Sequence, residues 1–203
     1  MKPSVAIVVL AAGRASRMGE GGAHKLLAEF DGVPLIRRVA RAALASEASA
    51  VIVVVGHRLV EIRNALHDLP LHIIENPAYG SGMASSLKAG FASRQSSGAD
   101  GILVMMGDMP GISSANINQL IETFEDARGE AIVRCVADGQ PGNPVILPNS
   151  LKDAVLRLDG DMGARGIIET CGLPIIGVEI GAAARLDLDT PEAIVEAGGV
   201  LKA

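Results

Sequence analysis

Three short runs of consecutive apolar residues, rich in β-branched side chains, mark the first half of the chain. They cover residues 5–10, 51–55 and 102–106. Strands that are apolar on both faces are typical of parallel sheets covered by helices on both sides. The pattern therefore predicts three buried parallel strands.

Apolar residues at helical spacing separate these runs. Helices are predicted within 35–44, 60–66 and 117–124. Pro34 is placed to form the first turn of the first helix, and Ser114 or Asn116 to cap the third. Alternating strands and helices with right-handed crossovers predict an α/β fold, a three-layer α/β/α sandwich with a mostly parallel sheet.

The second half of the chain is less regular. The elements predicted there are strands at 131–136, 145–147 and 175–178, helices after Asn149 and Asp161, and a last helix that begins at Pro191. Residues 138–144 are dense in turn formers and predict a loop. Since no linker, repeat or charge block interrupts the chain, we expect a single domain over residues 1–203.

Composition narrows the class of protein. Of the 203 residues, 49% are apolar and 20% charged, which excludes disorder. A net charge of −5 with four aromatic residues argues against nucleic-acid binding. The mean hydropathy is +0.35, but the apolar run at 5–12 is far shorter than the ~20 residues of a membrane span. With no signal peptide apparent and two cysteines, we expect a cytoplasmic protein without membrane contact.

The loop after the first strand carries candidate chemistry. Residues 10–19 are rich in small residues, include Arg14 and Arg17, and are followed by Lys25. Small residues let backbone N–H groups approach an anion, and the cations supply charge for a triphosphate. The loop is neither a Walker A motif nor a dinucleotide fingerprint, because His24 and Leu26 flank the lysine. Taken alone, the pattern fits a loose turn with solvated arginines equally well.

The sequence Leu-Ala-Ala-Gly-x-x-x-Arg-Met-Gly followed by a lysine resembles the signature loop of the MobA-like NTP transferase family, which includes the molybdenum cofactor cytidylyltransferases. Further segments resemble family motifs in the same order, at 76–90, 107–110, 142–145, 160–165 and 188–192. The resemblance spans about residues 5 to 197, although the loop from Gly19 to Lys25 is longer than the family pattern. It implies a Rossmann-like sheet of the nucleotide-diphospho-sugar transferase type. The nucleotide-binding half would be about 1–110 and the acceptor-binding half about 111–203.

The resemblance also implies roles for individual residues. The nucleotide-binding set is Leu10, Ala11, Ala12, Gly13, Arg17, Lys25, Gly82, Ser85 and Ser86. The acceptor-binding set is Asn143, Pro144, Gly163 and Arg165. Arg17, Lys25 and Asp108 would be catalytic, and Asp108 and Asp189 would hold Mg²⁺ between nucleotide phosphates.

The two aspartates also have plain structural interpretations. Asp108 follows a predicted strand, where ligands bind in open α/β sheets, but Asp-x-Pro also suits an ordinary turn. Asp189 is placed to cap the last helix. Asp187 would share the side of Asp189 in a strand and is a further candidate near the metal.

The implied reaction is transfer of CMP from CTP to the phosphate of a molybdopterin-type cofactor, with release of pyrophosphate. A phosphate nucleophile is already ionised, so no general base is needed, and the four histidines are expected at the surface or in loops without a catalytic role. Family members that use GTP tend to carry Leu-Ala-Gly-Gly, so Ala12 favours CTP. The alternatives are GTP as donor, another phosphorylated acceptor, or a non-catalytic chaperone that hands the cofactor to a molybdenum hydroxylase.

Overall fold

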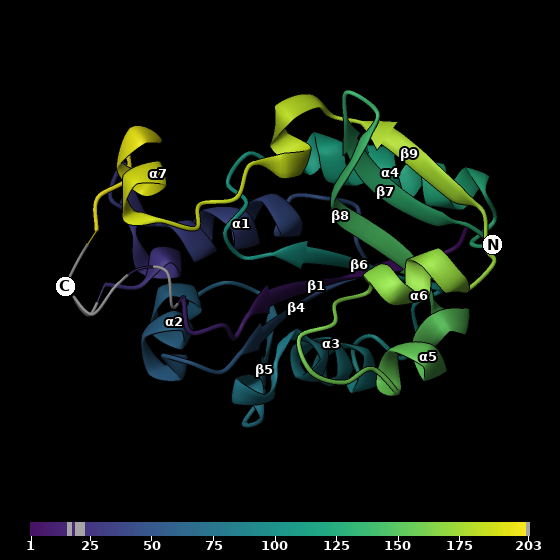
Figure 1. The fold of residues 1–203 in the computed structure, drawn as a ribbon, viewed down its shortest axis with the longest axis horizontal. Helices are drawn as coiled ribbons and strands as arrows, with labels where there is room; N and C mark the ends of the chain where they lie inside the picture. The colour runs from purple at the N-terminus through teal and green to yellow at the C-terminus, as the bar shows by residue number, and fades with distance from the viewer. Residues whose placement is uncertain (16–17, 19–22, 202–203) are drawn as a thin grey trace.

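A seven-stranded sheet runs through the centre of the computed structural model, which describes residues 1–15, 18 and 23–201. The strand order is β5-β4-β1-β6-β8-β7-β9 (Figure 1). The strands are β1 (Val5–Ala11), β4 (Ala50–Val55), β5 (His72–Glu75), β6 (Gly101–Met106), β7 (Ile132–Ala137), β8 (Gln140–Pro148) and β9 (Ile175–Glu179). β8 runs antiparallel to both of its neighbours, and the other pairs are parallel. The predicted mostly parallel sheet is confirmed.

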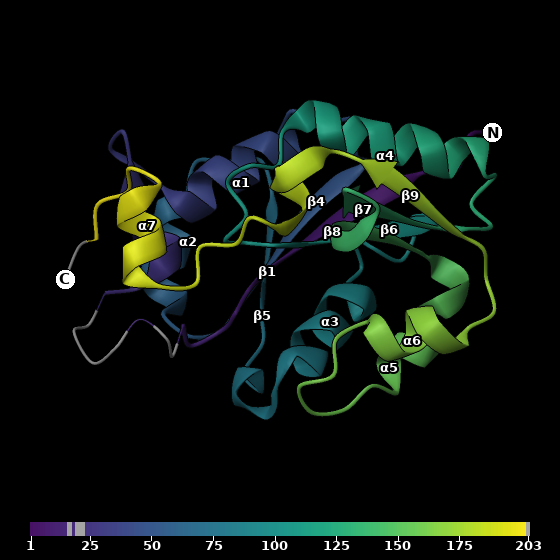
Figure 2. The same cartoon turned by 45° about the horizontal axis from the view of Figure 1, so that its top comes forward.

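Helices cover both faces of this sheet. Their bounds are α1 (Leu35–Leu44), α2 (Leu59–Leu66), α3 (Met83–Ala92), α4 (Ser114–Asp126), α5 (Lys152–Leu156), α6 (Arg165–Thr170) and α7 (Pro191–Glu196). Figure 2 shows α1 and α4 above the sheet and α3, α5 and α6 below it. Two separate buried clusters fill the spaces between the layers, so the three-layer sandwich is confirmed.

The alternation along β1 decides which side chains reach the site. Val5, Ile7 and Val9 point into the core under α1 and α4, whereas Ala6, Val8 and Leu10 point toward α3. Ala11 falls on the α1 side and Ala12 on the α3 side. Of residues 5–12 only Leu10 and Ala12 line the cavities described below, and both lie on the α3 side, so the register of β1 determines which residues of this segment can line a cavity.

The predicted caps need two corrections. α4 is capped by Ser113, whose hydroxyl accepts from the backbone N–H of Asn116 at 3.2 Å, and not by Ser114 or Asn116. Pro34 lies in the short strand β3 (Val33–Pro34), which pairs with β2 (Glu29–Phe30), and α1 begins one residue later. Both predicted helices nevertheless begin within three residues of the expected place.

The second half departs further from expectation. Residues 140–144 belong to β8, so the turn between β7 and β8 is confined to Asp138 and Gly139. A cross-strand partner overrides the turn propensity of this segment. Short 3-10 helices precede or join the remaining elements at η2 (Lys25–Leu27), η3 (Tyr79–Ser81), η4 (Asn149–Leu151) and η5 (Gly181–Arg185).

One glycine ties the two halves together below the sheet. Gly82 has φ +106°, and a Cβ there would lie 2.4 Å from the backbone of Gly160. The start of α3 therefore packs directly on the loop at 160–161, and the N–H of Ala84 donates to the carbonyl of Gly160 at 3.1 Å. Across the described residues, no helix is both long and apolar enough to span a bilayer.

Candidate active site

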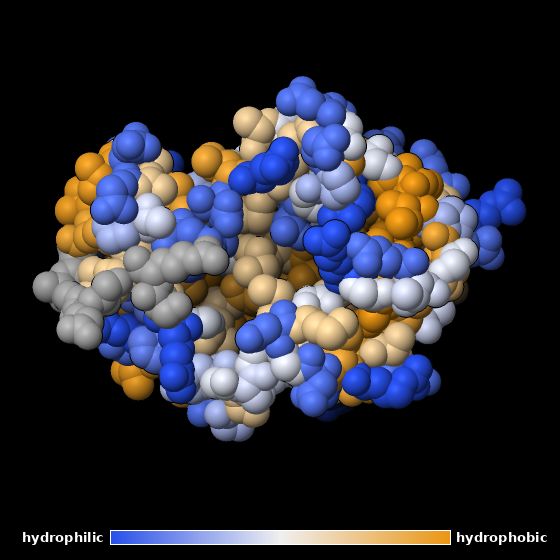
Figure 3. Space-filling model, viewed as in Figure 1, coloured by the Kyte–Doolittle hydropathy of each residue, from blue (hydrophilic) through white to orange (hydrophobic). Residues whose placement is uncertain are grey.

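Two adjoining cavities open beside the carboxyl ends of β1 and β6. The large cavity has a volume of about 940 Å³ and the small cavity about 340 Å³. Leu10, Met83 and Met106 line both. Figure 3 shows the corresponding face of the molecule hollowed at its centre, with hydrophilic residues around much of the rim. A ligand that fills one cavity would therefore meet a ligand in the other.

The small cavity brings together five of the predicted nucleotide-binding residues: Leu10, Ala12, Gly13, Gly82 and Ser86. Arg14 and Tyr79 complete its wall, with the guanidinium of Arg14 5.6 Å from the centre of the Tyr79 ring. Tyr79 lies in η3, and no sequence pattern predicted that it would line a cavity. This cavity combines flat, polar and small side chains, as a base-binding pocket does.

Three described residues of the predicted nucleotide set do not line the small cavity: Ala11, Ser85 and Lys25, the last of which lines the large cavity instead. Ala11 is buried on the opposite face of the sheet. The hydroxyl of Ser85 turns back to donate to the carbonyl of Gly82 at 2.8 Å, and it accepts from the side chain of Asn76. Arg17 lies outside the described residues, as do residues 19–22 of the long loop.

The loop backbone is held from below by two histidines. His24 is buried, with Nε2 3.2 Å from the carbonyl oxygen of Gly13, and the N–H of His57 donates to the carbonyl of Ala12 at 3.1 Å. His24 is a loop residue, as expected, but it is buried rather than exposed at the surface, and its ring supports the loop. Burial also lowers the pKa of His24, so the neutral ring is favoured.

Lys25 reaches from η2 into the large cavity and joins the two predicted metal ligands. Its ammonium contacts Asp108 Oδ2 and lies 2.5 Å from Asp189 Oδ1. Burial alone would lower the pKa of Lys25, but the charges of Asp108 and Asp189 outweigh it and raise the pKa above its ordinary value. Asp108 and Asp189, which lie 83 and 164 positions after Lys25 in the sequence, thus meet at its ammonium group.

The arrangement of these carboxylates fits a divalent cation. Asp108 is 4% exposed, and its Oδ1 is buried without a hydrogen-bond partner in the described structure. Oxygens of both aspartates already reach a common point at the Lys25 ammonium. The described residues contain no group of three or more His, Cys, Asp or Glu that could hold a metal. The site therefore suits a cation such as Mg²⁺, which takes one or two carboxylates and completes its shell with phosphates and water.

A direct backbone contact joins the two aspartate segments. The N–H of Leu188 donates to the carbonyl of Asp108 at 3.2 Å. Leu188 is buried, while Asp187 and Asp189 both line the large cavity. The segment is not a strand, but the expected common side of Asp187 and Asp189 is what the structure shows. Thr190 caps α7 through its hydroxyl, so the capping role considered for Asp189 is wrong.

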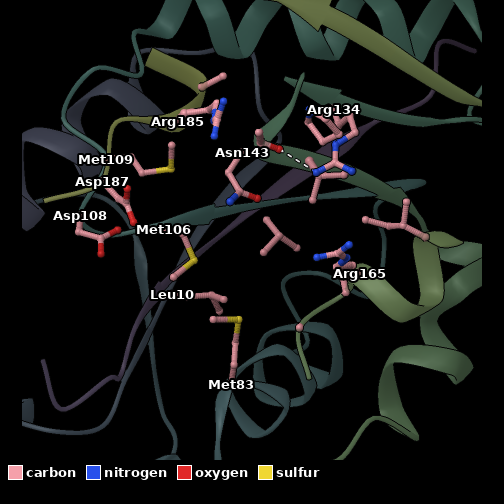
Figure 4. Close-up of a pocket in the computed structure, with 18 of the residues that line it drawn as sticks. Leu10, Met83, Met106, Asp108, Met109, Arg134, Asn143, Arg165, Arg185 and Asp187 are labelled. Atoms are coloured by element: carbon pink, nitrogen blue, oxygen red, sulfur yellow. Dashed lines mark hydrogen bonds between the residues drawn. The ribbon is translucent and has the colours of Figure 1, made fainter. Parts of the chain in front are cut away.

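The acceptor-half residues are brought to the same cavity with one exception. Asn143, Gly163 and Arg165 line the large cavity, and Figure 4 shows Asn143 and Arg165 facing its interior. Pro144 is buried in β8 and lies outside the lining. Strand alternation explains the difference, because neighbouring residues of β8 point to opposite faces.

A model of the MobA-like NTP transferase domain matches residues 7–175. This range includes the loop beside the two cavities, Lys25 and Asp108. The chain belongs to the MobA-like NTP transferase family. The resemblance drawn from its motifs is confirmed, and the protein is a nucleotidyltransferase of this family.

Curated relatives of this transferase have diverse names. Nicotine blue oxidoreductase of Paenarthrobacter nicotinovorans is 30% identical over 168 residues, 80% of each chain. Purine catabolism protein PucB of Bacillus subtilis is 28% identical over 203 residues, 91% of each chain. Bifunctional protein GlmU of Coxiella burnetii is 32% identical over 119 residues, and the match spans 58% of this chain but a quarter of GlmU.

Solved structures share the transferase fold over nearly the whole chain. A nucleotidyl transferase from Methanothermobacter, Mth528, superposes with a TM-score of 0.81 at 25% identity, covering 96% of this chain and 95% of that one. Rv0371C of Mycobacterium tuberculosis in complex with manganese gives 0.77 at 22% identity, covering 95% and 97%. CMP:2-keto-3-deoxy-manno-octonic acid synthetase complexed with CTP gives 0.75 at 15% identity, covering 96% of each. The last two identities show a common fold alone.

Sequence reasoning missed several residues that line the transferase's cavities. Arg134 lies in β7 and Arg185 ends η5, and both line the large cavity. For Arg134 a signal was present, because it is a lone charge inside the otherwise apolar run 131–136. Met83 and Met106 form the apolar wall between the cavities, and nothing in their sequence context distinguishes them from core residues.

Proposed function

We propose that this transferase moves the CMP moiety of CTP to the phosphate of a molybdopterin-type cofactor and releases pyrophosphate. One observation carries the proposal: the small cavity beside Ala12 and the large cavity at Lys25, Asp108 and Asp189 share a wall. A base in the first would direct its triphosphate toward the cations and carboxylates of the second. The acceptor would then approach from the side of Asn143 and Arg165.

Base recognition would lie in the small cavity. The side chain of Ala12 points into it from the loop, and its methyl occupies room that the second ring of a purine needs. Ser86 is buried in the wall and accepts from Asn76 at 3.0 Å, so its hydroxyl is oriented. Ser85 would support this wall from behind rather than touch the base. These features favour a pyrimidine and hence CTP.

The triphosphate would lie against Lys25, with Arg17 proposed as a second phosphate ligand. Asp108 and Asp189 would hold Mg²⁺ or a comparable divalent cation there. Such a cation, when bound, neutralises charge on the phosphates and on the leaving pyrophosphate. Lys25 would then donate to phosphate oxygens, because its three N–H donors suit an anion of this kind. Ala11 and Gly13 would contribute backbone groups at the turn.

Catalysis by this site would consist of positioning and charge stabilisation. The attacking phosphate oxygen of the acceptor is ionised at neutral pH, so the chain's own residues need not remove a proton. Asn143 and Gly163 line the acceptor side of the cavity and would orient the incoming group, and Pro144 would fix the backbone beside Asn143. Holding two reactants in line accounts for a large part of the rate in such transfers.

The remaining assignments are proposals of the same kind. We place the protein in the cytoplasm, acting as one domain over residues 1–203, since a single sheet passes through the nucleotide half and the acceptor half. The product would pass to a molybdenum hydroxylase. The manganese complex of Rv0371C and the CTP complex of the octonic acid synthetase are consistent with this use of metal and nucleotide.

The test is a product analysis by mass spectrometry. The protein is incubated with Mg²⁺, molybdopterin cofactor, and either CTP or GTP, in the absence of any electron donor. We expect a cofactor heavier by one CMP unit, and pyrophosphate, with CTP preferred. Transfer to other phosphorylated acceptors but not to molybdopterin would replace the acceptor. Tight nucleotide binding without pyrophosphate would indicate a chaperone.

A further inference from the structure

Two arginines lie at one end of the large cavity, away from Asp108 and Asp187. Figure 4 shows Arg134 and Arg165 on one side of the cavity and Asp108 and Asp187 on the other. Arg134 comes from β7 and Arg165 from α6, so distant segments deliver the two guanidiniums to one place. Arg185 lines the same cavity from η5.

Arg134 occupies a position that the sheet would otherwise fill with an apolar residue. Its neighbours Val133 and Cys135 are buried on the opposite face, and Ile132, on its own face, is fully buried in the core under α5 and α6. One Nη of Arg134 donates to the carbonyl of Gly142 at 3.2 Å. Its Nε is buried and has no hydrogen-bond partner. A buried donor without an acceptor is costly, and a ligand would satisfy it.

The charges around Arg134 point to an anion. Arg165 is paired with Glu169 at 2.8 Å, whereas no ion pair joins Arg134 to any carboxylate within residues 1–15, 18 and 23–201. Burial and the neighbouring charge of Arg165 lower the pKa of Arg134. Two guanidiniums on the same side of one cavity are suited to bind a phosphate-like oxyanion, because each offers paired N–H donors.

We propose that Arg134 and Arg165 bind a second anionic group of the acceptor, a phosphate-like oxyanion remote from the oxygen that attacks CTP. The apolar wall of Met83, Met106 and Val145 lies in the same cavity. The acceptor class is therefore an elongated molecule with an anionic group at each end and a less polar middle. This inference rests on the proposed function, since it names the substrate that the transfer would use.

The first test follows the side-chain Nε–H signal of Arg134 by NMR, with inorganic phosphate as the probe. The isotope-labelled protein is saturated with CTP and Mg²⁺, so that the nucleotide's own phosphate sites are filled. The signal is assigned by its loss in Arg134→Gln. We expect phosphate to shift it in a saturable way, and Arg165→Gln to weaken phosphate binding about ten-fold or more. A signal unmoved by phosphate overturns the proposal.

The second test separates ligand binding from a structural role. Arg134→Met replaces the half-buried cation with an apolar side chain of similar length. Without ligand its Tm should equal or exceed that of the wild type, and added phosphate should raise the Tm of the wild type alone. The proposal is wrong if the Tm of Arg134→Met is lower than that of the wild type and phosphate raises both Tm values equally, because Arg134 is then structural. Arg157→Gln, an exposed arginine that does not line the cavity, is the control and should alter neither.

In the transferase assay Arg134→Gln should raise the KM for the acceptor about ten-fold or more while leaving the KM for CTP unchanged. If the wild type transfers nothing to molybdopterin, the proposed acceptor is wrong. The phosphate titration then still shows whether the two arginines bind an anion. Normal transfer by Arg134→Gln, with an unchanged acceptor KM, removes the second anionic subsite and leaves the proposed function standing.

Discussion

The two ends of the large cavity differ in how their charged side chains are paired. At one end Lys25 is closed into a cluster with Asp108 and Asp189, so the cation and the carboxylates stabilise each other. At the other end Arg134 has a buried, unpartnered Nε and a second arginine beside it. The lysine end can exchange partners when a nucleotide and a cation arrive. At the arginine end Glu169 pairs with Arg165, whereas Arg134 has no ion pair within the described residues, which suits this end to an anionic group of the second substrate.

The largest expected effect comes from Asp108. Asp108→Ala should lower kcat/KM for nucleotidyl transfer about 10³-fold, because it removes a buried charge at the reacting phosphates. Asp153→Ala, an exposed aspartate on α5, is the matched control and should leave kcat/KM unchanged. Asp68 is unsuitable as a control because it pairs with Arg37 at 2.5 and 2.7 Å. Equal losses in both variants would remove Asp108 from the site.

Lys25 should affect stability as well as turnover. Lys25→Met removes the ammonium that pairs with the buried Asp108, which should cost about 3 kcal/mol in the free energy of unfolding. Added Mg²⁺ should raise the Tm of the variant by more than it raises the Tm of the wild type. A variant with wild-type stability in metal-free buffer would show that the cluster does not hold the lysine end together.

The choice between CTP and GTP tests whether the small cavity, which adjoins the lysine end, contacts the nucleotide and not the acceptor. Ala12→Gly removes a methyl from the small cavity and frees φ, so the preference for CTP over GTP should narrow about ten-fold. The KM for the acceptor should stay the same, since Ala12 does not line the arginine end. The ratio of kcat/KM for the two nucleotides measures this. A wild type that prefers GTP would exclude the cytidylyl assignment.

The smallest effect is a pH dependence of the loop. The pKa of His24 is lowered by burial, so below its ordinary value of 6.5 the unfolded state binds more protons than the folded state. Stability should therefore fall as the pH drops below about 6.5. Thermal unfolding of His24→Gln should show less of this fall, whereas His67→Gln, at an exposed histidine, should behave as the wild type does. Parallel curves for wild type and His24→Gln would contradict the role of His24.

The sequence predicted the lysine end better than the arginine end, for a physical reason. Buried parallel strands such as 5–10 have a pattern that survives in one dimension, and the loop that follows each strand must lie at the same sheet edge. β8 was obscured because Gln140, Pro141 and Gly142 read as turn formers, although pairing with β7 makes them a strand. Arg134 was missed because only the sheet register reveals which face it occupies. The contact between Lys25 and two distant aspartates likewise exists only in three dimensions.

The account rests on transfer of the α-phosphoryl group with its nucleoside, and isotope position tests that directly. CTP labelled at the α-phosphate and CTP labelled at the γ-phosphate are each incubated with the protein, Mg²⁺ and molybdopterin cofactor. We predict that the α-label moves to the cofactor and that the γ-label leaves as pyrophosphate, at equal rates. A γ-label on the cofactor, or no label on it from either substrate, would contradict the account.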